Sequence, residues 1–256
     1  MKDKRIIILG GNSISTNIVF NYLDNKYGIF LTIIEEKEPL NIFLKRRIKR
    51  LGLLTVLGQI IFQVVVVKIL SLFSKKRIAE IIKKNNLNTN AIPASKIEKV
   101  DSINSAKTIE LIKNHSPDLI IINGTRILST KILQCTDCSF INTHAGITPL
   151  YRGVHGMYWA LVNNDPLNSG VTVHYVDKGI DTGNIIEQQI VKPTERDNFV
   201  TYPLLQISVG IELLADVVHR FFNETIKIKS NPGTSKLYYH PTVGQYIYYR
   251  IVRKVK

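Results

Sequence analysis

The stretch RIIILGGNSISTNIVFNYL, residues 5–23, decides the fold of this 256-residue chain. A short apolar run ends at a Gly-Gly pair, and cap-type residues follow before Ile14, Ile18 and Tyr22 recur at four-residue spacing. A buried strand, a tight turn and an amphipathic helix explain this order. The stretch therefore predicts the opening unit of a doubly wound α/β sheet, in which ligands bind at the carboxyl ends of the strands.

Later segments fit the same mostly parallel architecture. Further strands are predicted over residues 27–34, 118–123, 139–142, 170–176 and 184–191. A long helix without proline is predicted over residues 204–222. We therefore expect one catalytic domain over residues 1–192, followed by a short C-terminal subdomain, residues 193–256, that consists of a helix and a tyrosine-rich tail.

The composition excludes a disordered chain and points to an anionic partner. Hydrophobic residues make up 45% of the sequence, enough to build a sizeable core. The net charge is +14, and residues 37–84 alone hold 12 basic and 2 acidic residues, a net +10. Such a field can attract nucleic acid, a membrane surface or phosphorylated small molecules. A lysine-rich bias of the source proteome is the plain alternative.

An apolar, basic segment of about residues 39–90, here called the insert, interrupts the sheet pattern. It carries KRRIKR at residues 45–50 and then 17 residues, 51–67, without a charge. Seventeen residues are few for a membrane span, and contact with an anionic membrane surface is an alternative that we do not favour. We expect two or three helices over residues 42–72 that pack on the sheet domain or on a second subunit. The buried stripe would comprise Ile48, Leu51, Leu54, Leu57, Ile61, Val64 and Ile69, and the wet face Lys45, Arg46, Lys49 and Arg50. We expect this basic face to lie at the crevice or beside a neighbouring phosphate, which would give the insert a role in substrate recruitment.

The cysteines and the opening residues bear on location and on metal binding. The opening MKDKRIII lacks a signal-peptide layout, because charge runs straight into a short apolar burst. Cys135 and Cys138 spell CTDC, which we interpret as two ordinary thiols in a reduced compartment. The histidines show no metal-ligand spacing. We expect a cytoplasmic protein without a metal site.

Residues that could carry chemistry are concentrated between positions 123 and 188. Asn142 and His144 lie two residues apart just past a predicted strand, so their side chains share a face. Asp181 lies in a loop between Gly179 and Gly183, which allow close approach to a ligand. The amide and a protonated histidine could hold a developing oxyanion in an acyl or formyl transfer, while the carboxylate orients or charges the imidazole. No Ser or Cys stands beside the pair, so we expect direct attack by an amine substrate.

Four motifs in this region form a recognisable set. They are NGTRILS at 123–129, INTHAGITPLYRG at 141–153, GVTVHYV at 170–176 and DKGIDTG at 177–183. Their order and spacing resemble the formyltransferase family that uses 10-formyltetrahydrofolate. This family includes glycinamide ribonucleotide formyltransferase, methionyl-tRNA formyltransferase and the amino-sugar nucleotide N-formyltransferases. The resemblance covers residues 117–192, is weaker for the opening unit and is absent from the insert.

The resemblance implies a role for individual residues. Asn142, His144 and Asp181 fall on the family's catalytic Asn, His and Asp. The folate-binding segments, where main-chain groups hold the pterin, fall on Thr125, Arg126, Ile127, Leu128, Val176, Asp177, Gly179 and Ile180. A turn that resembles the phosphate-cradling turn of the ribonucleotide enzyme comprises Ser13, Ser15, Thr16 and Asn17. Arg152 could bind a substrate phosphate, with a structural salt bridge as the alternative.

The expected activity is transfer of a formyl group from 10-formyltetrahydrofolate to a primary amine of an anionic small molecule. We favour a nucleotide-linked amino sugar, because basic groups suit its diphosphate and the tyrosines of residues 236–250 could bind its base. The alternative for these tyrosines is a strand pair that packs on the body. Glycinamide ribonucleotide and methionyl-tRNA are alternatives. Only 64 residues follow Lys192, too few for the C-terminal barrel of the usual tRNA enzyme, so we expect no nucleic-acid partner. An alternative of another class is a non-catalytic or membrane-surface binding protein that has the same fold. The protein could also form a homodimer.

Other histidines and aromatic residues have plainer interpretations. His174 alternates with Val173 and Tyr175 on a predicted strand, which favours a packed histidine over a second catalytic base. His155 and Trp159 are one helical turn apart, and we expect them to pack beside the site.

Overall fold

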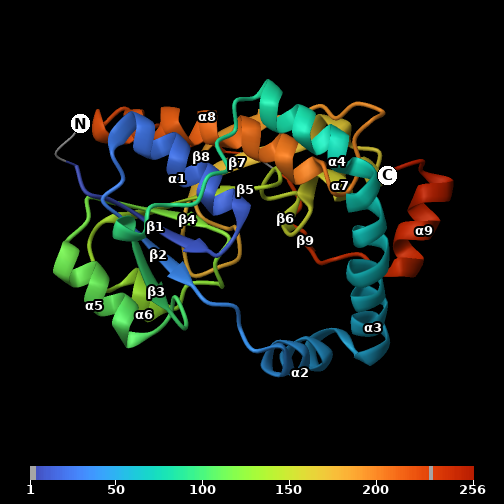
Figure 1. Cartoon of the computed structure of the whole chain (residues 1–256), viewed down its shortest axis with the longest axis horizontal. Helices are drawn as coiled ribbons and strands as arrows, with labels where there is room; N and C mark the ends of the chain where they lie inside the picture. The colour runs from blue at the N-terminus through green and yellow to red at the C-terminus, as the bar shows by residue number, and fades with distance from the viewer. Residues whose placement is uncertain (1–3, 231–232) are drawn as a thin grey trace.

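The strands of the sheet place their carboxyl ends along one edge, where the predicted chemistry lies. The computed structural model describes residues 4–230 and 233–256 (Figure 1). In this described part, seven strands form one sheet in the order β3-β2-β1-β4-β5-β7-β8, parallel from β3 to β5 and antiparallel from β5 to β8. Their bounds are β1 Ile6–Gly11, β2 Leu31–Glu35, β3 Ile97–Val100, β4 Leu119–Asn123, β5 Ser139–His144, β7 Gly170–Tyr175 and β8 Ile185–Ile190.

Helices cover both faces of this sheet, as a doubly wound fold requires. Successive residues of β1 point to opposite faces, so Ile6 and Ile8 pack in one core with α1 (Ile14–Tyr27) and α8 (Tyr202–Phe222). Ile7 and Leu9 pack in a second core with α5 (Ala106–His115) and α6 (Thr130–Leu133). Figure 1 shows α1 and α8 on one side of the sheet and α5 and α6 on the other. The predicted α/β class and mostly parallel sheet are confirmed.

The structure divides the C-terminal residues differently from the predicted subdomain over 193–256. Helix α8 contacts β7 and β8, and it buries Ile211, Leu214 and Val218 in the core of the sheet. Helix α9 (Val243–Val252) instead packs on the insert. A helical repeat in the sequence shows that α8 has an apolar face, but it does not show which surface that face covers. The remaining elements are α7 (Gly156–Val162), the 3₁₀ turns Ala94–Lys96 and Pro166–Asn168, and a small sheet of β6 (Arg152–Gly153) and β9 (Leu237–Tyr238).

The insert consists of one short helix and one long one. Helix α2 (Leu40–Leu51) ends at Gly52, and a continuous helix follows as α3 (Leu53–Ile61), the π-helical turn Phe62–Val66 and α4 (Val67–Lys84). The long helix packs on the body through one side, which buries Val56, Gln59 and Phe62. Two or three helices were expected here, and this part of the prediction agrees with the structure.

The buried side of the long helix was predicted incorrectly. The apolar spacing predicted burial of a stripe, five of whose seven members are between 40% and 84% exposed in this chain: Leu54, Leu57, Ile61, Val64 and Ile69. Both sides of the helix are apolar, so periodicity could not choose between them. The buried side of the helix is the one whose polar group forms hydrogen bonds with the body. Gln59 donates to the carbonyl of His240 and accepts from Arg47. Packing of the exposed side on a second subunit remains a prediction.

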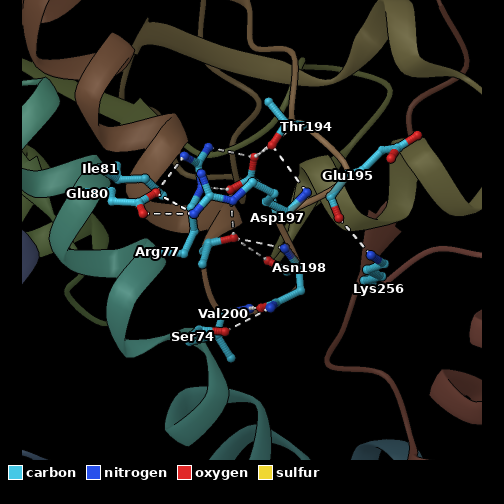
Figure 2. A network of polar contacts seen from close by, with 12 residues as sticks. Ser74, Arg77, Glu80, Ile81, Thr194, Glu195, Asp197, Asn198, Val200 and Lys256 are labelled. Atoms are coloured by element: carbon cyan, nitrogen blue, oxygen red, sulfur yellow. Dashed lines mark hydrogen bonds and ion pairs between the residues drawn. The ribbon is translucent and has the colours of Figure 1, made fainter.

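A polar network fastens α4 to the segment that follows β8 (Figure 2). Arg77 donates to both carboxylate oxygens of Asp197, at 2.8 and 3.0 Å, and Asn198 donates to the hydroxyl of Ser74 at 2.8 Å. Burial alone would raise the pKa of Asp197, but hydrogen bonds from Arg77 and Thr194 outweigh it and hold this pKa below its usual range. The long helix is therefore held along its side.

Candidate functional site

A cavity of about 590 Å³ opens at the carboxyl ends of β4 and β5. This is the edge at which doubly wound sheets bind their ligands. Residues from four separate regions line the cavity: Gly124–Leu128 beyond β4, Asn142–Ala145 at the end of β5, the loop between β7 and β8, and the C-terminal segment around Tyr239. Asn142, His144 and Asp181 all lie on its wall, so the fold brings the three predicted catalytic side chains together.

His144 is fixed by contacts on both ring nitrogens. Its Nε2 lies 2.8 Å from the carbonyl oxygen of Tyr151, which can only accept a hydrogen bond, so Nε2 carries a proton. Its Nδ1 lies 3.3 Å from Oδ2 of Asp181. An oxygen acceptor therefore faces each ring nitrogen of His144, and these two contacts fix the orientation of the ring. The His144 ring thus lies at the wall of the cavity beside the carboxylate of Asp181.

Asn142 is oriented by His174, a residue for which the sequence favoured simple packing. Nδ1 of His174 donates to the carbonyl oxygen of Tyr175 at 2.7 Å, and burial lowers the pKa of His174. The neutral ring therefore accepts at Nε2 from Nδ2 of Asn142, 3.2 Å away. An amide nitrogen has two N–H groups, so Asn142 can also donate to a ligand in the cavity. Alternation along β7 could not show this pairing, because it depends on the register between β5 and β7.

The loop that carries Asp181 is held by the chain at β6. The main-chain N–H of Gly153 donates to Oδ2 of Asp181 at 2.9 Å, and Arg152 donates to the carbonyl of Ile180 at 2.8 Å. Within the loop, Asp177 accepts from the N–H of Gly179 and from the hydroxyl of Thr182. Arg152 therefore contacts the loop that carries Asp181, and its role in phosphate binding remains a prediction.

The residues predicted to bind folate form two walls of the cavity. All eight line it: Thr125, Arg126, Ile127, Leu128, Val176, Asp177, Gly179 and Ile180. The first wall is fastened by Glu35 at the end of β2, whose carboxylate accepts from the main-chain N–H of Arg126 at 2.9 Å and pairs with its side chain at 3.0 Å. Because the Arg126 guanidinium is paired with Glu35, it is not available to a ligand. The main chain of this wall and the side chain of Ile127 can contact one.

The predicted phosphate-cradling turn lies outside this cavity. Ser13 caps α1, and Thr16 is buried, with its hydroxyl donating to the carbonyl of Gly11 at 2.6 Å. Ser15 accepts from Asn123, and Asn17 donates to the carbonyl of Thr89. None of the described residues that line the cavity belongs to this turn. These contacts explain the turn as a strand-to-helix connection, and its role in substrate binding remains a prediction.

The cavity has a further rim that no single motif predicted. Arg50 of α2, His155 and the tyrosines Tyr238 and Tyr239 also line it, and the Arg50 guanidinium lies 5.2 Å from the ring centre of Tyr239. The basic residues of the insert were expected to face the crevice, and Arg50 lines it, whereas the contact between Arg50 and Tyr239 was not predicted. Arg50 thus links the insert to the cavity.

A partly buried histidine pair connects this rim to the long helix. His155 Nε2 lies 2.9 Å from Nδ1 of His240, which also lies 3.0 Å from the side-chain amide of Gln63. Burial lowers the pKa of His155 to about 3, with a smaller contribution from His240, and burial lowers that of His240 to about 4. Both rings are therefore neutral, and His155 packs beside the site, as expected for it, while also reaching the cavity wall.

Cysteine and metal chemistry receive no support from the geometry. Cys135 and Cys138 are free thiols whose pKa values are raised by burial. Within the part of the chain that the structure describes, no three His, Cys, Asp or Glu side chains are grouped closely enough to hold a metal ion.

Comparison with known proteins agrees with this arrangement of residues. The family model for formyl transferases matches residues 54–203, more than half of the chain. The chain belongs to the formyl transferase family. The match extends into the insert as far as residue 54, further than the four motifs reach. The family resemblance of the motifs is thus confirmed.

The individual relatives fall into two groups, proteins that match this chain in sequence and solved structures that match its fold. The methionyl-tRNA formyltransferase of Thermodesulfovibrio yellowstonii is 32% identical over 134 residues, which are 52% of this chain and 42% of that protein. The chain therefore spans about two fifths of the length of the curated relatives that it matches.

Two solved structures show the same fold at low identity. The N-formyltransferase of Helicobacter canadensis, in complex with folinic acid and dTDP-3-aminofucose, is 19% identical with a TM-score of 0.54, over 92% of this chain and 70% of that chain. The phosphoribosylglycinamide formyltransferase of Streptococcus pneumoniae is also 19% identical, with a TM-score of 0.55, over 86% and 99% of the two chains. At such identities the likeness concerns the fold.

Proposed function

We propose that this protein transfers the formyl group of 10-formyltetrahydrofolate to a primary amine, and that the amine belongs to a nucleotide-linked amino sugar. The observation that carries the proposal is the meeting of Asn142, His144 and Asp181 on the wall of one cavity, between two segments suited to a folate. The family match supports the same reaction.

The residues present fit a folate co-substrate. The two walls of the cavity offer apolar side chains, among them Ile122, Leu128 and Val176, beside main-chain segments that can bond a pterin edge. An aromatic ring between apolar side chains with a few polar groups at its edge is the usual composition of a small-molecule site. The donor's formyl group would then lie near the catalytic side chains.

The site can perform the transfer without a covalent enzyme intermediate. The amine nitrogen attacks the formyl carbon, and a tetrahedral intermediate forms with its negative charge on the formyl oxygen. Asn142 donates a hydrogen bond to this oxygen, and His144, protonated and oriented by Asp181 in this proposal, places a positive charge close to it. Collapse breaks the bond from carbon to N10 of the folate, and the proton released by the amine passes through Asp181 to N10. The products are tetrahydrofolate and the N-formyl amine.

The rim of the cavity supports the proposed acceptor class. Arg50 offers a cation to a diphosphate, and Tyr238 and Tyr239 offer aromatic faces to a nucleobase. The Helicobacter canadensis enzyme, which shares the fold, was solved with a nucleotide-linked amino sugar. Methionyl-tRNA is the second candidate acceptor, because the curated relatives that match in sequence are methionyl-tRNA formyltransferases.

The test is to offer the full-length protein 10-formyltetrahydrofolate with one acceptor at a time. The acceptors are dTDP- and UDP-linked amino sugars, glycinamide ribonucleotide and methionyl-tRNA, and the product is identified by mass spectrometry. We expect an N-formyl product with a nucleotide-linked amino sugar. Product with methionyl-tRNA or the ribonucleotide alone would overturn the proposed acceptor, and absence of product with every acceptor would overturn the proposed reaction.

A further inference from the structure

The long helix of the insert presents an apolar side to solvent along most of its length. Leu53, at its first turn, and Phe73, five turns later, bound this surface, and Phe73 is 86% exposed. The exposed residues recur at helical spacing on one face and form what we call the apolar face: Leu53, Leu54, Leu57, Ile60, Ile61, Val64, Val65, Ile69, Leu72 and Phe73. At 1.5 Å per residue this face is about 30 Å long. Contiguous apolar patches of this size on a soluble monomer mark an interaction site.

Exposed basic side chains lie within the apolar face and on the neighbouring parts of the chain. Lys68 lies within it, Lys75 and Lys76 follow it directly, and all three are exposed. Helix α2, which precedes it, exposes Lys45 and Lys49. Helix α9, which packs on α3, likewise exposes Ile247, Ile251 and Val252 next to Arg253 and Lys254. Apolar side chains with a basic border are typical of helices that lie in the plane of an anionic membrane.

The charge decides between the two occupants that could cover this face. A second copy of the chain would bring the same basic border, so like charges would meet around the contact. An anionic lipid surface would cover the apolar side chains and attract the border at the same time. Charge complementarity therefore favours lipid.

The contacts of the long helix with the body indicate whether it would cross a bilayer or lie in its surface. Within the described residues, the helix Leu53–Lys84 is long and apolar enough to cross a membrane, and 17% of its most apolar window is buried. However, its opposite side is fastened to the body by Gln59, Phe62 and the Arg77–Asp197 pair. A crossing helix would have to break these contacts and expose a buried carboxylate. The helix can therefore lie in the membrane surface without leaving the fold.

We propose that the insert attaches this protein to the surface of an anionic lipid bilayer, with the apolar face immersed in the plane of the interface. Arg50 belongs to the same insert and lines the cavity, so attachment holds the rim of the cavity near the lipid surface. This inference concerns binding alone, and its test does not depend on formyl transfer.

The test is flotation of the full-length protein, purified without detergent, with lipid vesicles. Vesicles of phosphatidylcholine and phosphatidylglycerol, three to one, are compared with phosphatidylcholine alone. We expect at least about tenfold more protein to float with the anionic vesicles, and this excess to fall at high salt, since salt screens the attraction between basic residues and an anionic surface. Equal flotation with both vesicles, or flotation with neither, would overturn the proposal.

Matched variants separate the apolar face from general surface chemistry. The double variant Leu54→Glu/Leu57→Glu should reduce flotation at least about tenfold. The control Leu167→Glu/Ile228→Glu makes the same change at exposed apolar positions outside the insert and should not reduce it. Thermal unfolding of each variant shows that it is folded. Equal losses in both double variants would contradict attachment through this face.

A charge pair and an assembly measurement complete the design. Lys75→Gln/Lys76→Gln should lower flotation with anionic vesicles, whereas Lys113→Gln/Lys131→Gln, in α5 and α6 at the other end of the molecule (Figure 1), should not. Sedimentation equilibrium without lipid should show the same molecular mass before and after Leu54→Glu/Leu57→Glu. A stable dimer that this variant dissociates would assign the apolar face to a second copy and overturn the proposal.

Discussion

Replacement of Arg77 with methionine removes the charge that holds α4 against the body while keeping a side chain of similar reach. Arg77 contacts both carboxylate oxygens of Asp197, and its side chain is 18% exposed (Figure 2). The variant leaves the Asp197 carboxylate buried without its cation. If the long helix is fastened along its side, this single change should destabilise the whole fold.

The expected loss can be worked out from these contacts. Removing one partner of a buried ion pair costs about 3–5 kcal/mol. Asp197 keeps hydrogen bonds from the N–H and the hydroxyl of Thr194, at 2.8 and 2.7 Å, so we expect the lower limit, about 3 kcal/mol. For a chain of this size, such a loss lowers the unfolding temperature by about 6–12 °C.

The assay is denaturant unfolding at several pH values, with Arg196→Met as the matched control. Arg196 also pairs with a carboxylate, that of Glu80, but its side chain is 59% exposed, so its loss should cost about 1 kcal/mol or less. The depressed pKa of Asp197 gives stability that is present above the unfolded value of about 3.9 and is lost as the pH falls through the folded value. The difference between wild type and Arg77→Met should thus be constant from about pH 5 to 7 and shrink below about pH 4. Equal losses in Arg77→Met and Arg196→Met would refute the reasoning.

Three further changes test the walls and rim of the cavity. Glu35→Ala releases the main chain of Arg126, and folate affinity, measured by fluorescence titration, should fall about tenfold; unchanged affinity would contradict the role of Glu35. Gly153→Ala places a Cβ 2.3 Å from the carbonyl oxygen of Tyr238 at a φ of +94°, so calorimetry should show a loss of about 1–3 kcal/mol; a stable variant would show that the loop tolerates a side chain there. Arg50→Ala should raise the KM of the amine substrate about tenfold with kcat nearly unchanged, because its contact is made equally before and during the reaction; a fall in kcat alone would remove Arg50 from substrate binding.

Much of the fold could be predicted because its signals are local. The apolar run and glycines before α1 predict a strand and a turn, and N–T–H at the end of β5 places two polar side chains on one face. Asp181 was found through its glycine-flanked loop and the family motif. Each of these signals depends on residues close in the sequence, where backbone geometry leaves few alternatives.

The remainder depends on contacts that join distant segments. His174 orients Asn142 only because β5 and β7 pair in one particular register. Arg50 and Tyr239 meet at the cavity although 189 positions separate them in the numbering. The buried side of the long helix was predicted incorrectly, since hydrophobicity is similar on both sides and the choice depends on polar partners such as His240 and Asp197. Sequence periodicity carries no information about partners of this kind.

The central claim is that Asn142, His144 and Asp181 act together in formyl transfer at one cavity. The most direct test measures kcat for Asn142→Ala, His144→Ala and Asp181→Asn with 10-formyltetrahydrofolate and an accepted amine, alongside folate affinity. The control Asn223→Ala changes an amide at the exposed end of α8. We predict that kcat falls at least about 100-fold in each of the three variants, with folate affinity and the control nearly unchanged. Activity within tenfold of wild type in any two of the three would contradict the account.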